Sequence, residues 1–382
     1  MASEAVSTAV ANATVQRLLS REPAVAPSPE DETFQSRCLQ GVSRTFALTI
    51  PQLPRALARA VANAYLLCRV ADTIEDDPGI LPDEKVTYLE AFLAELERGG
   101  DGALLASALA PRLSGASLPA ERELIHGLPR ILRITRSLST PQRHAMVRCV
   151  AIMGRGMALF SRRSARAGLE TLEDLQRYCY HVAGVVGEML TDLFCHHSPS
   201  IAVRRPRLAT LAASFGQALQ LTNILKDVWT DLERGACWLP RRLFAEEGYD
   251  LDVLPEAHRD DGFSRGLLRL VAVAHGSLRD ALEYVKTVPR RETGVRRFLI
   301  WAIGLSALTL SRIADNPTFT DRSQVKVSRT TVRRVVLATN LAIRSNAALE
   351  MLFRRWSRGL PAPVFTTAAV AAMSPDGWAL RD

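Results

Sequence analysis

The sequence is poor in lysine and in long apolar runs, and it lacks the common nucleotide-binding motif. Of its 48 cationic residues four are lysine and the rest are arginine, and they are scattered along 382 residues with a formal charge of +8. Nucleic-acid binders usually concentrate such charge on one face or tail. The charge is therefore a weak indication of anionic partners. No G-x-G-x-x-G is present, which excludes the Rossmann fingerprint.

The six cysteines lie far apart and show no C-x-x-C spacing, which predicts reduced, buried thiols. A membrane-spanning helix needs about 20 apolar residues. The uncharged stretch 298–311 is shorter, and the longer one at 208–225 carries polar side chains that include Gln217, Gln220, Thr222 and Asn223. No signal-peptide pattern opens the chain. We therefore expect a cytoplasmic protein, with peripheral contact to the cytoplasmic membrane left open.

Alternating β-branched runs are scarce, whereas apolar patterns with a period of 3.6 residues recur along the chain. These patterns predict an all-α fold with one domain at 33–358, a mobile N-terminal tail at 1–32 and an irregular C-terminal tail at 359–382. A loop or short-helix region is expected at 99–119. Helices are predicted at 54–76, 121–136, 141–163, 171–196, 205–232, 263–286, 291–313 and 329–357.

A polar stripe runs along the end of the first long helix. Tyr65, Arg69, Asp72 and Asp76 are spaced by four, three and four residues, so they share one helix face. A lone D-x-x-E-D motif of this kind is usually a solvated helix end. Here the surrounding sequence is largely apolar, and unpaired carboxylates in such surroundings are costly unless a cation binds them.

A second stripe repeats this arrangement far along the chain. Gln220, Asn223, Asp227 and Asp231 are spaced by three, four and four residues on an otherwise apolar helix. Oxygen ligands without nearby histidine or cysteine suit Mg²⁺, which commonly bridges to substrate phosphates. The two stripes together predict a helical cavity whose walls hold Mg²⁺ and a diphosphate.

Between the stripes lies a segment with two tyrosines, a histidine and two helical glycines. Gly184 and Gly187 are expensive inside a helix unless close packing or substrate access requires them. His181 is more often a hydrogen-bonded core residue than a catalyst. For Tyr178, catalysis and packing both remain open at this point.

Together these segments resemble the squalene and phytoene synthase family, the head-to-head prenyl transferases. The matching pieces are 43–46, 65–76, 178–187 and 220–240. The later segments 298–316, 325–329 and 338–340 are similar to squalene synthases within that family. The resemblance implies an isoprenoid synthase fold, a single helical domain around a central hydrophobic cavity.

The resemblance also implies roles for individual residues. The Mg²⁺ ligands would be Asp72, Glu75, Asp76, Asn223, Asp227 and Asp231. The substrate diphosphates would be bound by Arg44, Arg69, Lys226 and Arg234. The catalytic set would be Tyr178, Arg69, Phe46 and Tyr65. The cofactor NADPH would meet Ser43, Asn223, Lys326 and Arg329.

Two positions depart from the family pattern. Ala236 stands where many relatives carry an arginine that serves the diphosphate, and Arg234, Arg241 or Arg242 could compensate. Lys226 stands where arginine is usual, which replaces a planar guanidinium that can donate two parallel hydrogen bonds with a compact ammonium charge. These departures concern the diphosphate clamp and leave the predicted Mg²⁺ ligands unchanged.

The implied reaction joins two farnesyl diphosphates into presqualene diphosphate, which NADPH then reduces to squalene. The alternatives are a phytoene or dehydrosqualene-type synthase without reduction, or an enzyme that stops at presqualene diphosphate or hydroxysqualene. A catalytically inactive partner subunit is a further alternative. From another class, a basic helical nucleic-acid-binding or scaffold protein stays open, although it leaves both carboxylate stripes unexplained. We expect a monomer that binds no nucleic acid.

Overall fold

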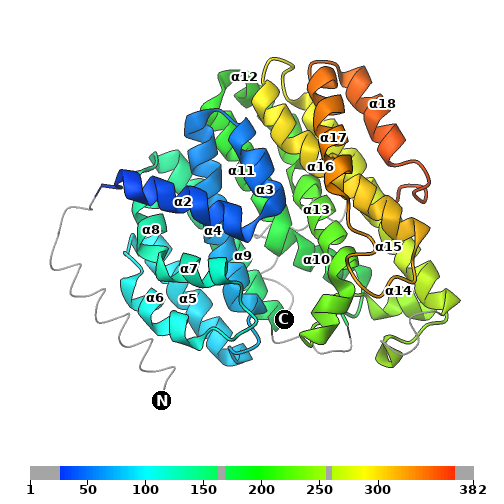
Figure 1. Cartoon of the computed structure of the whole chain (residues 1–382), viewed down its shortest axis with the longest axis horizontal. Helices are drawn as coiled ribbons and strands as arrows, with labels where there is room; N and C mark the ends of the chain where they lie inside the picture. The colour runs from blue at the N-terminus through cyan, green and yellow to red at the C-terminus, as the bar shows by residue number, and fades with distance from the viewer. Residues whose placement is uncertain (1–25, 162–167, 255–259, 366–382) are drawn as a thin grey trace. The chain divides into compact units, whose positions relative to one another are not determined.

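The computed structural model describes residues 26–161, 168–254 and 260–365 (Figure 1). In these ranges the chain forms helices and one isolated β-bridge, between Leu169 and Pro240, and the all-α prediction is confirmed. The chain divides into two compact units, unit 1 at Met1–Arg162 and unit 2 at Arg163–Asp382, and each is described by itself. The predicted single domain stays a prediction. Residues 1–25 and 366–382 of the predicted tails lie outside the described residues.

Unit 1 is built around two long helices. The described helices of unit 1 are α2 (Pro29–Val42), α3 (Arg44–Thr49), η1 (Ile50–Gln52), α4 (Arg55–Asp76), α5 (Pro82–Arg98), α6 (Ala103–Leu109), η2 (Ala110–Arg112), α7 (Pro119–His126), α8 (Leu128–Ser137) and α9 (Thr140–Ser161). Helix α4 packs against α2, α5, α7, α8 and α9. Its apolar side is buried at Leu66, Val70 and Ile74, so the opposite face carries the first polar stripe.

A buried polar network fixes the start of α4 within unit 1. The fully buried Asn63 donates from Nδ2 to Thr135 Oγ1 at 2.7 Å and accepts from Gln35 Nε2 at 3.2 Å. These bonds join α4 to α8 and α2. Because each buried polar group has a partner, the network costs little and specifies how the three helices pack.

Unit 2 is built around its longest helix. The described helices of unit 2 are α10 (Leu172–Cys179), the π-helical turn η3 (Tyr180–Gly184), α11 (Val185–His197), α12 (Pro199–Ala202), α13 (Arg205–Glu233), α14 (Arg241–Glu246), η4 (Leu251–Val253), α15 (Asp261–Thr287), α16 (Thr293–Asp315), α17 (Arg329–Ala342) and α18 (Asn346–Trp356). Helix α13 contacts α10, η3, α11, α15 and α16. It therefore presents its second polar stripe from the middle of the unit.

Glycines allow α13 to approach the segment that carries Tyr178. A Cβ on Gly187 would lie 1.9 Å from the Ala212 carbonyl oxygen, and one on Gly216 would lie 1.8 Å from the Ala183 oxygen. Both distances are impossible for real atoms, so the two backbones meet only because side chains are missing. This confirms the close-packing explanation for Gly187.

Arg296 joins three helix ends in unit 2. It is fully buried and donates to the carbonyl oxygens of Ile343 (2.8 Å), Val285 (3.0 Å) and Val288 (2.8 Å), and to Asn346 Oδ1 at 2.8 Å. Burial lowers the pKa of this guanidinium to about 10. Three of its four partners are backbone carbonyl groups at helix ends, which would otherwise lack a donor.

Several predicted helix boundaries need correction. The predicted helix 329–357 is two helices, because residues 343–345 interrupt it and Ser345 caps α18 by accepting from Ala348 N. The predicted helix 121–136 likewise divides at Gly127 into α7 and α8. Helix α5 was missed. Helix α2 begins at Pro29, inside the segment 1–32 assigned to the tail, with Ser28 as its cap.

Helix α16 is the one described helix that could cross a membrane by length and composition. It has 23 residues, and 67% of its most apolar window is buried inside the structure. Most of that apolar surface is therefore already used in packing. Core helices of folded domains often pass the same test.

Candidate active site

The first stripe lies on the last turns of α4. Arg69 connects it to α7, since its Nη1 lies 3.6 Å from Asp72 Oδ2 and its Nη2 donates to Glu121 Oε1. Glu121 is 8% exposed, and its other oxygen accepts from Leu118 N at 2.8 Å. Glu121 therefore fixes the position of Arg69. Glu121 is not among the residues predicted for the site, and its one sequence signal is its place as the third residue of α7.

Burial, with smaller contributions from neighbouring carboxylates, gives Asp72 on this stripe an unusually high pKa. Burial raises the pKa of Asp72 to about 7, while Arg69 opposes the shift and the Asp76 and Glu121 carboxylates add to it. Carboxylates brought this close together favour a bound cation or proton. The arrangement is consistent with the predicted cation-binding role of Asp72, Glu75 and Asp76.

The segment before α4 contributes the residues predicted beside this stripe. Ser43 caps α3 by accepting from Phe46 N at 3.0 Å. Burial raises the pKa of Tyr65, while the Arg69 charge and a Ser43 hydrogen bond oppose that shift. The Phe46 and Tyr65 rings lie 4.9 Å apart between centroids. Arg44 is exposed at the start of α3 and forms no ion pair with the described residues. The structure thus brings Ser43 and Phe46 against Tyr65 on the first stripe, whereas the Arg44 side chain forms no hydrogen bond or ion pair with them.

Asp77 belongs to the loop after α4 and not to the stripe. It is buried and accepts from Gly79 N at 2.7 Å and from Ser114 N at 3.0 Å, and it also accepts from the Ser117 hydroxyl. Burial raises the pKa of Asp77, but these hydrogen bonds outweigh it and the net shift is downward. Its bonds give Asp77 a structural role, which distinguishes it from its neighbour Asp76.

The second stripe lies on the last turns of α13 in unit 2. Lys226 Nζ lies 3.1 Å from Asn223 Oδ1 and 3.1 Å from Asp227 Oδ2. The other oxygen, Asp227 Oδ1, is buried and has no hydrogen-bond partner among the described residues. A buried anionic oxygen without a donor is costly. That oxygen is therefore suited to a cation.

Tyr178 lies flat against Trp238. It is 4% exposed at the end of α10, and the two ring centroids are 3.8 Å apart with planes 9° apart. The bridge between Leu169 and Pro240 holds the two chain segments together, with Leu169 N donating to Leu239 O at 2.9 Å. Trp238 has no predicted role, because a partner sixty positions away along the chain leaves no spacing signal.

The structure distinguishes the three arginines that could replace the one missing at Ala236. Arg241 binds Asp252 with two bonds of 2.7 and 2.9 Å, and Arg242 Nε donates to Glu170 Oε1 at 2.9 Å. Arg234 caps the end of α13, is exposed and forms no ion pair with the described residues. Arg234 is thus the cation available to a diphosphate beside the second stripe.

Lys326 and Arg329 lie at the entry to α17. Both are exposed, and in the described ranges neither side chain forms an ion pair or a hydrogen bond to Asn223. The structure therefore does not join Lys326 and Arg329 directly to Asn223, the other unit 2 residue predicted for the cofactor.

No three histidine, cysteine, aspartate or glutamate side chains cluster closely enough to hold a metal ion by themselves in the described part of the chain. Each stripe spreads its carboxylates along a helix face instead. Mg²⁺ is commonly held by one or two carboxylates, waters and substrate phosphates. The donor set therefore fits Mg²⁺ that arrives with a diphosphate.

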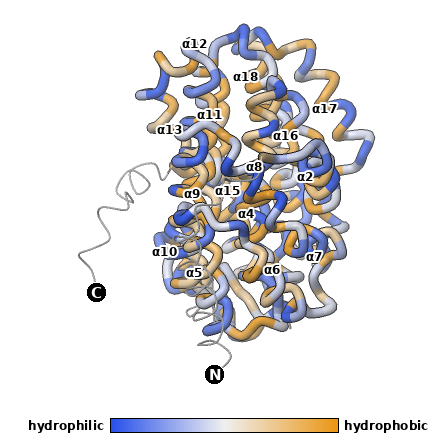
Figure 2. The backbone as a smooth tube through the Cα atoms, turned by 90° about the vertical axis from the view of Figure 1, so that its left-hand side faces the viewer, coloured by the Kyte–Doolittle hydropathy of each residue, from blue (hydrophilic) through white to orange (hydrophobic). Residues whose placement is uncertain are grey.

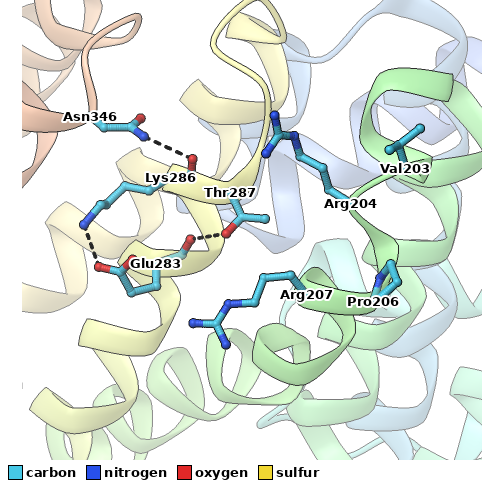
Figure 3. A pocket seen from close by; sticks show the side chains of 8 residues that line it. All are labelled: Val203, Arg204, Pro206, Arg207, Glu283, Lys286, Thr287 and Asn346. Atoms are coloured by element: carbon cyan, nitrogen blue, oxygen red, sulfur yellow. Dashed lines mark hydrogen bonds and ion pairs between the residues drawn. The ribbon is translucent and has the colours of Figure 1, made fainter.

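A cavity of about 450 Å³ lies elsewhere in unit 2, between the start of α13 and the end of α15 (Figure 3). Its lining residues are Val203, Arg204, Pro206, Arg207, Glu283, Lys286, Thr287 and Asn346. None of the predicted site residues lines it. A separate small gap is lined by Asp231, Ala236 and Trp238, among others, beside the second stripe.

The fold defines an all-α isoprenoid synthase, and two helices carry polar carboxylate stripes. The family model for squalene/phytoene synthase matches residues 39–331, and the chain belongs to this family. A squalene synthase of Eremothecium gossypii is 30% identical over 324 residues, 81% of this chain and 69% of the relative. One from Gibberella zeae is 26% identical, over 79% of this chain and 63% of the relative.

Solved structures agree with this assignment. A structure described as TcSQS with the ligand BPH1237 superposes with a TM-score of 0.71 at 25% identity, covering 91% of this chain and 97% of the other. A dehydrosqualene synthase matches with a TM-score of 0.61 at 21% identity, covering 83% and 97%. The second match supports the fold alone. The isoprenoid synthase fold implied by the sequence resemblance is confirmed.

Proposed function

We propose that this chain is a squalene synthase, which joins two farnesyl diphosphates head to head and then reduces presqualene diphosphate to squalene. One observation carries the proposal. Each polar stripe lies near an aromatic pair, Phe46 with Tyr65 and Tyr178 with Trp238. Diphosphate departure requires the cationic and metal-binding groups, and the carbocation that remains requires apolar and aromatic walls.

Mg²⁺ suits the oxygen ligands of both stripes. The buried Asp227 Oδ1 without a donor and the crowded Asp72 carboxylate are the two observations that support this fit. The proposed ligands are Asp72, Glu75, Asp76, Asn223, Asp227 and Asp231. When bound, Mg²⁺ neutralises charge on the departing diphosphate.

The protein's own side chains would bind the diphosphates and accept the proton. Arg44, Arg69, Lys226 and Arg234 bind the diphosphate oxygens. Tyr178 lies against Trp238 with little exposure, so we place its hydroxyl at the proton that leaves when the cyclopropane ring closes. The first half-reaction releases one diphosphate and one proton. The apolar surroundings exclude water, which would otherwise capture the cation as an alcohol.

When bound, NADPH would supply the hydride of the second half-reaction, in which presqualene diphosphate would lose its diphosphate and squalene would form. The exposed Lys326 and Arg329 carry no ion pair with described residues, which suits them to the phosphates of this cofactor. Ser43 and Asn223 complete the proposed set. Lys226 donates to Asn223 Oδ1, which leaves the second lone pair of that oxygen for a metal and the amide nitrogen for the cofactor.

Product analysis tests the proposal. The full chain is incubated with farnesyl diphosphate and Mg²⁺, with and without NADPH, and the hydrocarbons are identified by mass spectrometry. Squalene formed only with NADPH is the expected result. A conjugated triene formed in either condition would instead assign a dehydrosqualene-type synthase, and an alcohol would assign an enzyme that ends with capture of water.

We also propose that the chain works as a monomer in the cytoplasm, in peripheral contact with the cytoplasmic membrane. The apolar product supports this location, since squalene partitions into lipid. A nucleic-acid-binding or scaffold role would leave unexplained the unpartnered Asp227 Oδ1 and the membership of the squalene/phytoene synthase family. Fractionation of cells tests the location. Light scattering of the purified chain tests the monomeric state.

A further inference from the structure

The segment from residue 326 to 358 holds almost all of the excess positive charge. It contains eight arginines and lysines and one acidic residue, Glu350, against a formal charge of +8 for the whole chain. Cations occur along the whole chain, but in this segment they are accompanied by a single acidic residue, which leaves a local excess of positive charge. All eight cations are exposed, and among the described residues only Arg354 is ion-paired, 3.3 Å from Glu350.

The same segment exposes large apolar side chains. Leu337 and Leu341 on α17 are 65% and 84% exposed, and Met351 on α18 is 66% exposed. The buried residues Val335, Thr339 and Ala342 occupy the opposite side of α17. Since Leu337 and Leu341 are four residues apart, they form one stripe on the outward face.

Cations border this apolar stripe. Arg333 is four residues before Leu337, and Arg334 lies one position further on. At 100° per residue, both fall within about a quarter turn of the two leucines. The outward face of α17 thus joins apolar and cationic side chains, and in Figure 2 this helix carries hydrophobic and hydrophilic residues in turn.

Helix α18 extends this surface. Helices α17 and α18 pack against each other, and both pack on α16, so their outward faces are turned away from the same helix (Figure 1). Arg355 follows Met351 by four residues and is exposed, whereas Leu349, Phe353 and Trp356 are buried on the inner side. We name Arg333, Arg334, Leu337, Leu341, Met351 and Arg355 the α17–α18 face.

We propose that the α17–α18 face docks on the surface of an anionic lipid bilayer. Interfacial helices combine apolar residues that enter the headgroup region with arginines and lysines that meet anionic lipid. Charge complementarity selects the anionic bilayer, and the exposed leucines favour it over nucleic acid, which offers them no apolar partner. The inference deepens the proposed membrane contact and would place the enzyme where its apolar product dissolves.

Vesicle co-sedimentation of the full chain tests this face. We expect binding to phosphatidylcholine vesicles containing about one third phosphatidylglycerol, little binding to phosphatidylcholine alone, and release as salt is raised. The double variant Leu337→Gln/Leu341→Gln should lose this binding. Arg333→Gln/Arg334→Gln should weaken it by about fivefold for each cation removed.

Matched controls come from exposed residues of unit 1. Leu104 and Leu118 are 45% and 50% exposed, and Leu104→Gln/Leu118→Gln should leave vesicle binding unchanged. Arg55→Gln/Arg98→Gln removes two exposed cations of unit 1 and should likewise leave vesicle binding unchanged. Thermal unfolding of each variant confirms that it is folded, since all of these side chains lie on the surface.

Three results would overturn the proposal. The first is vesicle binding that survives both α17 variants. The second is a dimer, detected by light scattering, that the leucine variant dissociates. The third is binding to duplex DNA that is stronger than binding to the anionic vesicles, and that is lost in the arginine variant and kept in the leucine variant. Turnover of farnesyl diphosphate without lipid should be unchanged in both variants. If the proposed function is wrong and the docking face is right, the wild-type chain will show no turnover and will still bind vesicles.

Discussion

The ring of Tyr178 stacks on the ring of Trp238, 3.8 Å between centroids and 9° between planes. This contact joins α10 to the segment after the second carboxylate stripe, and it orients a phenol that is nearly excluded from solvent. We therefore treat Trp238 as a positioning residue for Tyr178.

Replacing Trp238 with leucine should slow formation of presqualene diphosphate by about 2- to 12-fold, because a stacked aromatic pair is worth about 0.5–1.5 kcal/mol. Trp238→Phe should retain most of the rate, and Tyr178→Phe should lose more than either. Single-turnover assays of the first half-reaction measure this. Equal rates in wild type and Trp238→Leu would show that Trp238 does not position Tyr178 for the reaction.

Replacing Asp227 with asparagine should abolish most turnover and leave stability intact. The change removes a buried oxygen that has no donor, so the melting temperature should stay equal or rise while kcat falls about 100-fold or more. Glu233→Gln on the same helix is the matched control, since Glu233 is exposed. A stability loss in Asp227→Asn without an activity loss would indicate a structural carboxylate.

Replacing Arg234 with glutamine should raise KM for farnesyl diphosphate about tenfold, as expected for one lost charged hydrogen bond. Arg242→Gln removes only an exposed pair with Glu170 and should leave KM unchanged and stability within about 1 kcal/mol. Steady-state kinetics distinguish the two. Should Arg242→Gln raise KM instead, the compensating arginine would be Arg242.

Adding a methyl group at Gly216 should destabilise unit 2 by about 1–3 kcal/mol or more, because the new Cβ would lie 1.8 Å from the Ala183 oxygen. Gly154→Ala on α9 is the control. Its Cβ would meet Leu93 at 3.4 Å, an ordinary contact, so the better helix propensity of alanine should stabilise by up to about 1 kcal/mol. Urea unfolding curves measure both effects.

The ion pair between Asp31 and Arg133 should make stability depend on pH. Arg133 donates to Asp31 at 2.7 and 3.0 Å, and these bonds lower the pKa of Asp31 despite opposing burial. The stabilisation is therefore complete above the unfolded value of about 4 and is lost as pH falls through the folded-state pKa. We expect Asp31→Asn to cost about 1–3 kcal/mol at pH 7.

The pH series itself provides the check on this prediction. Unfolding free energies of wild type and Asp31→Asn should converge at acidic pH, and Asp83→Asn, at an exposed position, should follow wild type throughout. A difference that is constant from neutral to acidic pH would mean that the side-chain volume matters and the charge does not.

Local periodicity was enough to predict the all-α class and both carboxylate stripes. Spacings of three and four residues place Asp72 and Asp76, or Asp227 and Asp231, on one helix face whatever the rest of the chain does. The buried thiols were also predictable and are confirmed at five of the six cysteines, with Cys195 intermediate. The break between α17 and α18 was not, because both halves continue the same apolar period.

Long-range contacts were decided by tertiary structure alone. Helical spacing separates Asp76 from Asp77, but nothing in the sequence reveals the loop hydrogen bonds that Asp77 accepts. The partners Glu121 for Arg69 and Trp238 for Tyr178 come from distant segments, as does the pairing of Arg241 and Arg242 that leaves Arg234 available. Helical spacing fixes which side chains share a face, whereas packing fixes what that face meets, because burial and charge pairing depend on residues far apart in the chain.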